Sequence, residues 1–151
     1  MTLEQDVLIG KNQQTVGLSF GFGCLLNMEQ KFGYSSQKLA TISQKLAILA
    51  QYAAAVNENP TANIAAPEIS LESSEINEFM AAVVKSANYS YAELNDEATV
   101  LTNDTKAYVA LESFGFEKIS EAFFAGYYGM LQATMKDKPV VESAQKKTKR
   151  K

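Results

Sequence analysis

The chain has 151 residues, of which 46% are hydrophobic, and this composition supports one domain with an ordinary core. It contains 17 acidic residues, 14 lysines and arginines, and no histidine. Because histidine is the commonest general base and a principal zinc ligand, its absence counts against hydrolases and zinc enzymes. We therefore expect no enzyme activity, no cofactor and no metal site.

The charge is divided between two parts of the chain. Residues 1–135 carry seven basic against fifteen acidic residues, a net charge of −8, whereas residues 136–151 carry seven against two, a net charge of +5. The second segment has too few apolar residues to offset the entropy lost on ordering. The sequence predicts a single domain over 1–135 and a disordered, flexible basic tail over 136–151. The cations that end this tail are Lys146, Lys147, Lys149, Arg150 and Lys151.

The first twenty residues predict a β-hairpin over 2–20. Residues 2–9 and 15–20 favour strands, and residues 10–14 between them have the composition of a turn. In the second strand Val16, Leu18 and Phe20 alternate with small or polar residues, so these three side chains are expected on the buried face.

The remainder of the domain, residues 21–135, predicts a compact helical body. Apolar residues at steps of three and four predict helices over 21–32, 35–57, 73–88, 104–114 and 116–135. Residues 58–72 predict a loop, and residues 92–98 a weak helical turn. The fold class is thus mainly α with a small N-terminal β-hairpin, an α+β arrangement.

Two of these helices carry the clearest apolar stripes. Phe79 and Val83 lie at the centre of the stripe in 73–88 and are predicted core residues. The stripe of the helix over 35–57 is also expected to face the core, and its members are Leu39, Ile42, Leu46, Leu49, Ala50, Ala53 and Val56.

The single cysteine does not indicate a catalytic site. Cys24 lies among apolar residues and has no histidine to activate it, which favours a buried structural thiol. The chain starts with acidic residues rather than with a signal peptide, and its apolar stretches are interrupted before the length of a membrane span. We therefore expect a cytoplasmic protein without membrane contact.

The last predicted helix carries more aromatic residues than one core face can hold. The neighbours Phe123 and Phe124, and likewise Tyr127 and Tyr128, point in different directions from a helix. Some of them must lie at the surface, where Phe124, Tyr127 and Tyr128 are candidates for binding another protein or a second copy of the chain. The residues of this helix that are expected to face inward are Phe116, Ile119, Phe123, Met130 and Leu131.

The start of the chain resembles that of the tail assembly chaperones of long-tailed phages that infect Gram-positive bacteria. The resemblance rests on a strand, Gly10-Lys11, a second strand, and a predicted helix that ends in Lys31-Phe32-Gly33. In that family a short hairpin leads into a helix ending in glycine, and a mostly helical body follows. Ser19 and Gly21 depart from the pattern, because a basic residue is expected in this region. The likeness covers about the first forty residues.

The resemblance implies a non-enzymatic chaperone of virion assembly in the host cytoplasm. Such a protein would bind the tape-measure protein, help to recruit tail-tube subunits and be absent from the finished particle. Lys146-Lys147 also resembles the lysine pair that is encoded at the ribosomal slip site of this family, although a plain basic tail explains the pair equally well.

Two functions from other classes remain open. The protein could be associated with nucleic acid through residues 146–151, but so short a segment binds weakly, and the acidic body would repel phosphates. Alternatively, it could be a small acidic inhibitor that occupies the basic groove of a partner, which its net charge permits.

Overall fold

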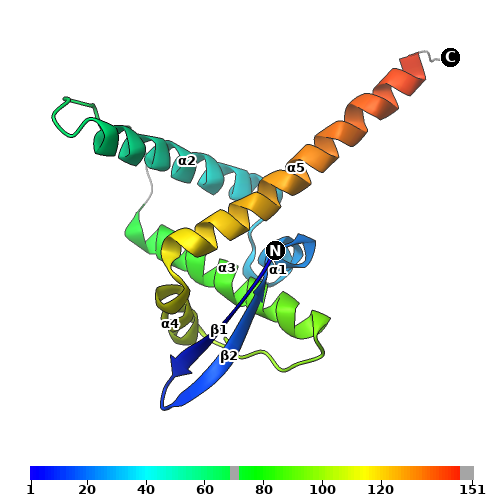
Figure 1. The fold of residues 1–151 in the computed structure, drawn as a ribbon. Coiled ribbons are helices and arrows are strands. Elements are labelled where there is room, and N and C mark those ends of the chain that lie inside the picture. The colour runs from blue at the N-terminus through cyan, green and yellow to red at the C-terminus, as the bar shows by residue number, and fades with distance from the viewer. Residues whose placement is uncertain (69–71, 147–151) are drawn as a thin grey trace.

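The computed structural model describes the backbone of residues 1–68 and 72–146, and the side chains up to residue 133 within these ranges (Figure 1). The elements in chain order are β1 (Thr2–Ile9), β2 (Asn12–Ser19), α1 (Phe22–Phe32), α2 (Ser36–Glu58), α3 (Ser73–Leu94), α4 (Asp104–Phe114) and α5 (Phe116–Lys146). The predicted fold class, mainly helical with an N-terminal hairpin, is confirmed.

The hairpin is tighter than predicted. Strands β1 and β2 pair antiparallel with Ile9 opposite Asn12, so the turn consists of Gly10 and Lys11 alone. Gly10 has φ +65, a conformation that glycine adopts without strain and that suits the twist of a two-residue hairpin. Val16, Leu18 and Phe20 are buried, as their alternation predicts.

Helix α3 forms the centre of the molecule and contacts α1, α4, α5 and β2. It continues past the predicted end at residue 88 to Leu94, and the helical turn predicted for 92–98 is therefore the end of α3 and a following turn. Tertiary packing explains the difference, because Ser90 and Tyr91 lie against the backbone of two glycines, Gly23 in α1 and Gly17 in β2.

A buried asparagine ties α3 to two other segments. The Asn88 amide nitrogen donates to the Gly17 carbonyl at 2.9 Å, and its amide oxygen accepts from the backbone nitrogens of Val100 at 3.0 Å and Leu101 at 2.9 Å. Hydrogen bonds at all of these groups offset the cost of burying the amide. Asn88 thus fixes the hairpin and the segment before α4 on one helix.

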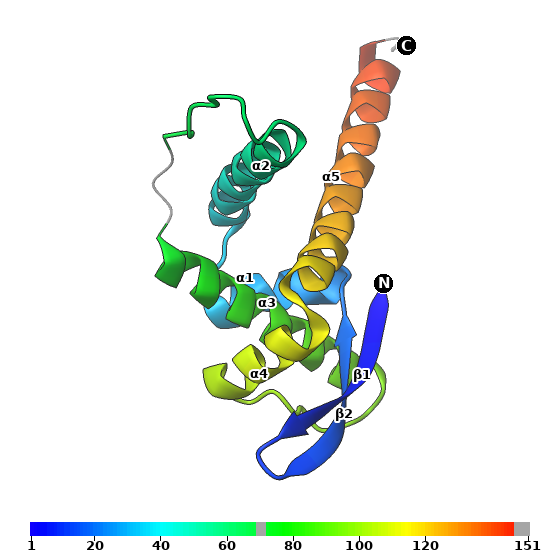
Figure 2. The ribbon, with the colours of Figure 1, turned by 60° about the vertical axis from the view of Figure 1, so that its left-hand side comes forward.

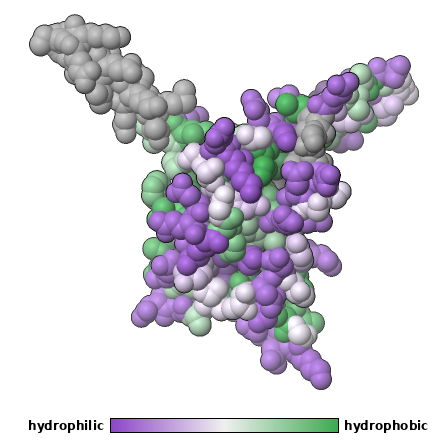
Figure 3. Space-filling view, turned by 180° about the vertical axis from the view of Figure 1, so that it is seen from behind, coloured by the Kyte–Doolittle hydropathy of each residue, from purple (hydrophilic) through white to green (hydrophobic). Residues whose placement is uncertain are grey.

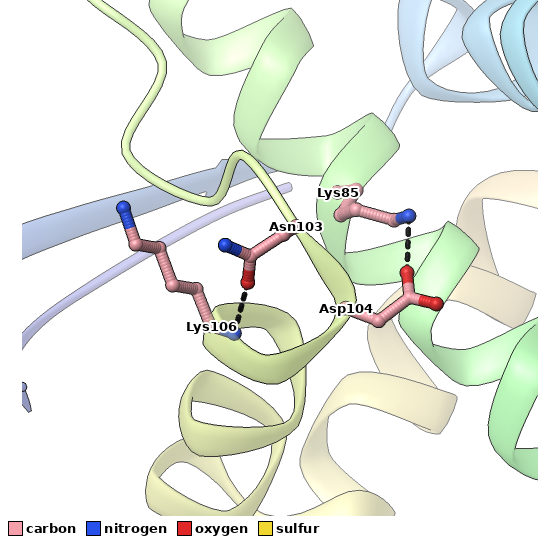
Figure 4. A network of polar contacts seen from close by, with 4 residues as sticks. All are labelled: Lys85, Asn103, Asp104 and Lys106. Carbon is pink, nitrogen blue, oxygen red and sulfur yellow. Dashed lines mark hydrogen bonds and ion pairs between the residues drawn. The ribbon is translucent and has the colours of Figure 1, made fainter.

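Helix α4 begins with a side-chain cap and an ion pair (Figure 4). The Asn103 side-chain oxygen accepts from the backbone nitrogen of Lys106 at 2.9 Å, as expected for a residue that caps a helix. The neighbouring Asp104 pairs with Lys85 of α3, which orients the start of α4.

Phe79 and Val83 are fully buried, which confirms their prediction as core residues. The Phe79 ring packs edge-on against Tyr34 and Phe123, with centroids 5.6 and 5.5 Å apart, and stacks on Phe124 at 6.5 Å. This aromatic cluster joins α3 to α5 and to the segment before α2.

Two helices extend beyond the core (Figures 1 and 2). Only the first turns of α2 are buried, through Leu39, Ile42 and Ser43, and the helix then leaves the body. The predicted stripe is thus wrong in its second half, where Ala50 and Ala53 are exposed. By length and composition α2 is the one helix of the described residues that could span a membrane, but that test also accepts core helices of soluble proteins.

Helix α5 also differs from its prediction, since its backbone remains helical past Met135 to Lys146. The side chains after residue 133 and all of residues 147–151 lie outside the part of the chain that the structure describes. The predicted cations Lys146, Lys147, Lys149, Arg150 and Lys151 fall in this region, so the flexible basic tail stays a prediction.

Candidate protein-binding groove

Helices α2, α3 and α5 line an open groove with a volume of about 530 Å³. Figure 2 shows α2 and α5 standing on the same side of α3. The side chains that line the groove come from all three helices and are Ser43, Leu46, Ala47, Leu49, Ala50, Ile76, Phe116, Ser120, Glu121, Phe124 and Tyr128. All but three of them are apolar or aromatic, so the groove suits an apolar ligand or segment.

The α2 wall of the groove is an uncharged helix that its own chain leaves largely uncovered. Residues 46–57 contain no aspartate, glutamate, lysine or arginine. Ile48 and Ala50 are exposed, and Leu46, Ala47 and Leu49 are only partly buried. A helix that is apolar around its circumference is normally buried. This part of α2 is therefore a surface that favours contact with another molecule.

The α5 wall contributes aromatic side chains. Phe124 is partly buried and stacks with Tyr128, with ring centroids 5.9 Å apart, and Tyr128 is 44% exposed. Phe116 and Leu131, which were expected to face inward, are 48% and 36% exposed. Phe116 begins the helix and lines the groove. The inward predictions for these two residues are wrong, because α5 has core neighbours on one narrow side only.

The three predicted binding residues do not lie together at the surface. Phe124 and Tyr128 line the groove, but Tyr127 is only 5% exposed and stacks on Phe123 with centroids 6.3 Å apart. Phe123 and Tyr127 are one helical turn apart and therefore share the core-facing side of α5. Burial, the main cause, raises the pKa of the Tyr127 phenol. Tyr127 therefore packs in the core and does not line this groove, although it lies in the wall of a smaller hollow.

The charges around the groove are predominantly acidic. Residues 46–84, a range that includes the α2 wall and the first half of α3, contain five glutamates and no lysine or arginine. On α5, Glu121 lines the groove, and Glu117 is exposed one turn earlier beside Lys118. Lys45, at the base of the wall, faces a separate shallow pocket that it shares with Glu75.

A smaller hollow of about 260 Å³ lies between α1, the start of α2 and α5. Its walls include Leu26 and Leu131, and Phe22, which is 70% exposed. It is a second apolar surface. From behind, the body shows mostly hydrophilic residues with small hydrophobic patches, and the end of α2 projects on the right (Figure 3).

The environment of Cys24 does not favour a reactive thiol. Cys24 is buried, and burial raises the pKa of its thiol to about 12, so the nucleophilic thiolate is strongly disfavoured. Within the described ranges, no group of three or more metal-ligating side chains occurs. The chemistry that the groove offers is the burial of apolar surface beside glutamates.

Comparisons with models of protein families, with curated proteins and with solved structures found no match for this chain. Function is therefore inferred from the groove and from the resemblance of the first forty residues.

The sequence predicts the aromatic half of the groove but not the α2 half. The spacing of the apolar residues in α2 fits an amphipathic helix and therefore predicts that they face the core. The signal that could have corrected this assignment is the absence of charge from residues 46–57. A helix at the edge of a core normally carries charges on its outer face.

Proposed function

We propose that this protein is a tail assembly chaperone of a long-tailed phage, which acts in the host cytoplasm without catalysing a reaction. In this proposal the groove between α2, α3 and α5 holds an apolar helical segment of the tape-measure protein and keeps it soluble. The observation that carries the proposal is the uncharged, largely uncovered wall of α2 opposite Phe124 and Tyr128.

The shape and lining of the groove fit the binding of a helix. An amphipathic helix inserts its apolar face into a hydrophobic groove through side chains at steps of three and four. The tape-measure protein is long and helical in the family that this chain resembles, so it would offer many such segments in turn. Phe124 and Tyr128 supply the large aromatic surface that dominates such interfaces.

A chaperone that also recruits tail-tube subunits needs a second surface. The hollow lined by Phe22, Leu26 and Leu131 is separate from the main groove and is also apolar. We assign it to the tail-tube subunit, so that both partners can be held at the same time.

Co-expression with the tape-measure protein tests the proposal. The full chain should keep the tape-measure protein soluble and co-purify with it, at low and at moderate salt, because apolar contacts are not screened. A tape-measure protein that aggregates in the presence of the chain, without any co-purification, would refute the proposal.

The same preparation separates the two alternatives. A nucleic-acid-associated protein would retain nucleic acid through residues 146–151 and release it steeply as salt rises. An acidic inhibitor would bind a basic host protein and leave the tape-measure protein unbound.

A further inference from the structure

The charges nearest the groove are mostly acidic, although Lys118 is exposed between Glu117 and Glu121 on α5. The stretch 46–84 is free of cations and contributes Glu58 at the far end of the α2 wall. On the α5 wall Glu117 and Glu121 lie in the first turns of the helix, and Glu121 lines the groove itself. A segment that enters the groove therefore meets an uncharged α2 wall on one side and the glutamates of α5 on the other.

We infer that the occupant of this groove is a basic amphipathic helix, with an apolar stripe that packs between α2 and α5 and with lysines or arginines on its flanks. This inference rests on the proposed function and specifies the chemistry of the partner. Opposite charges at the rim of an interface steer encounter and select the partner, whereas like charges disfavour it. An acidic helix of equal apolarity should thus be rejected.

Other occupants fit the charges less well. A second copy of the chain brings a net charge of −3 in all, and of −8 over its body, residues 1–135, towards these glutamates. An anionic membrane would be repelled by the same glutamates, although α2 is apolar enough to enter a bilayer. A basic amphipathic helix matches both the apolar walls of the groove and the glutamates beside them.

Designed peptides test the inference directly. The first peptide carries leucines at i, i+3, i+4 and i+7 and lysines on the other face of the helix. Its twin has glutamate in place of every lysine. A third peptide keeps the lysines, but its leucines are scattered around the helix and form no apolar face. Because the chain has no tryptophan, a single tryptophan on the apolar face of each peptide reports binding without background. Its fluorescence shifts to the blue when it enters an apolar site.

The lysine peptide should bind the full chain about tenfold more tightly than the glutamate twin at low salt, since several exposed charges act together. The difference should narrow as salt rises, because exposed charges are screened. Equal affinities of the two peptides would overturn the inference. Equal binding by the peptide with scattered leucines would do so as well, because it would show that charge alone retains the peptide.

Variants of the chain locate the site. Glu117→Gln and Glu121→Gln should each weaken binding of the lysine peptide about twofold to fivefold and strengthen binding of the glutamate twin by a similar factor. The matched control is Glu93→Gln, an exposed glutamate in the last turn of α3 outside the groove, which should change neither affinity. A loss at Glu93 equal to that at Glu121 would contradict binding in the groove.

The remaining outcomes separate this inference from the proposed function. If the tape-measure protein is captured while the two peptides bind equally, the charge preference is wrong and the chaperone proposal stands. If the lysine peptide binds selectively and the tape-measure protein is not captured, the groove has a basic partner of another kind. Binding to neutral phosphatidylcholine vesicles that the lysine peptide does not reverse would identify a membrane as the occupant and overturn the inference.

Discussion

Gly17 of β2 lies directly beneath the ring of Tyr91 of α3, so closely that a Cβ atom at Gly17 would overlap the ring carbons. The Tyr91 hydroxyl donates to the carboxylate of Glu4, which is the partner of Gly17 across the hairpin. The ring is therefore held at its far end and cannot move aside freely. Glycine is required here for packing.

Gly17→Ala should lower the free energy of unfolding by about 1–3 kcal/mol, because the added methyl group overpacks the contact with Tyr91. Chemical denaturation followed by circular dichroism measures the change. Gly129→Ala is the control, because no atom apart from its chain neighbours and the nearby backbone of its own helix lies within 4 Å of the position that its Cβ would take. Alanine also favours a helix, so this variant should be neutral or slightly stabilising. Equal effects of both substitutions would show that the Tyr91 contact is not responsible.

Phe79→Ala should cost about 3–5 kcal/mol in the free energy of unfolding, because the ring is fully buried and packs against three other aromatic rings. Phe22→Ala removes the same side chain from a site that is 70% exposed, and it should cost under about 1 kcal/mol. A loss below about 1 kcal/mol for Phe79→Ala would place Phe79 outside the core.

Asn88→Ala should destabilise the fold by about 1–3 kcal/mol or more, because it leaves the Gly17 carbonyl and the nitrogens of Val100 and Leu101 without their side-chain partner. Hydrogen exchange gives the sharper readout, since the amides of Val100 and Leu101 should lose protection before the rest of the core. Ser90→Ala is the control, because Ser90 is buried on the same helix but takes no part in these three hydrogen bonds. Unchanged exchange at Val100 and Leu101 would contradict the role of Asn88.

Features of the fold that depend on neighbours in the sequence could be predicted. The alternation of Val16, Leu18 and Phe20 identifies the hairpin face, and the spacing around Phe79 identifies the central helix. The predicted helix over 104–114 likewise agrees with α4, which begins at Asp104 and ends at Phe114.

Features that depend on distant contacts could not be predicted. The end of α3 is set by the packing of Tyr91 on Gly17, more than seventy positions earlier in the chain. The spacing of the α2 stripe predicts an apolar face but not whether anything covers it. Tyr127 and Tyr128, by contrast, could be separated from the sequence, because Phe123 is expected to face inward and Tyr127 lies one helical turn after it.

The stability of the fold should fall in alkaline solution partly through Cys24. Burial holds the folded thiol neutral up to a pKa of about 12, whereas the unfolded thiol ionises near its ordinary value of 9.0. The folded state therefore binds more protons between these values. The contribution of Cys24 is complete below pH 9 and is lost as the pH rises through about 12.

The difference in unfolding free energy between the wild type and Cys24→Ala isolates this effect, since lysines and tyrosines titrate in both proteins. It should shrink as the pH rises above 9. A difference that is constant from about pH 8 to about pH 11 would show that the thiol is accessible to water, as would rapid alkylation of the native protein by a maleimide.

Tyr128→Ala should weaken capture of the tape-measure segment about tenfold, because exposed aromatic anchors carry much of the energy in helix-binding grooves. Tyr128 is 44% exposed and lines the groove, so its removal should leave the free energy of unfolding nearly unchanged. Tyr108→Ala is a matched control, because Tyr108 is 38% exposed but lies on α4, outside the groove. Pull-down of the tape-measure segment by each purified variant measures the effect. Tyr127→Ala, unlike Tyr128→Ala, should lower the free energy of unfolding, because the Tyr127 ring is buried. Capture that falls equally for Tyr128→Ala and Tyr108→Ala, or for neither, would place the binding surface elsewhere on the molecule.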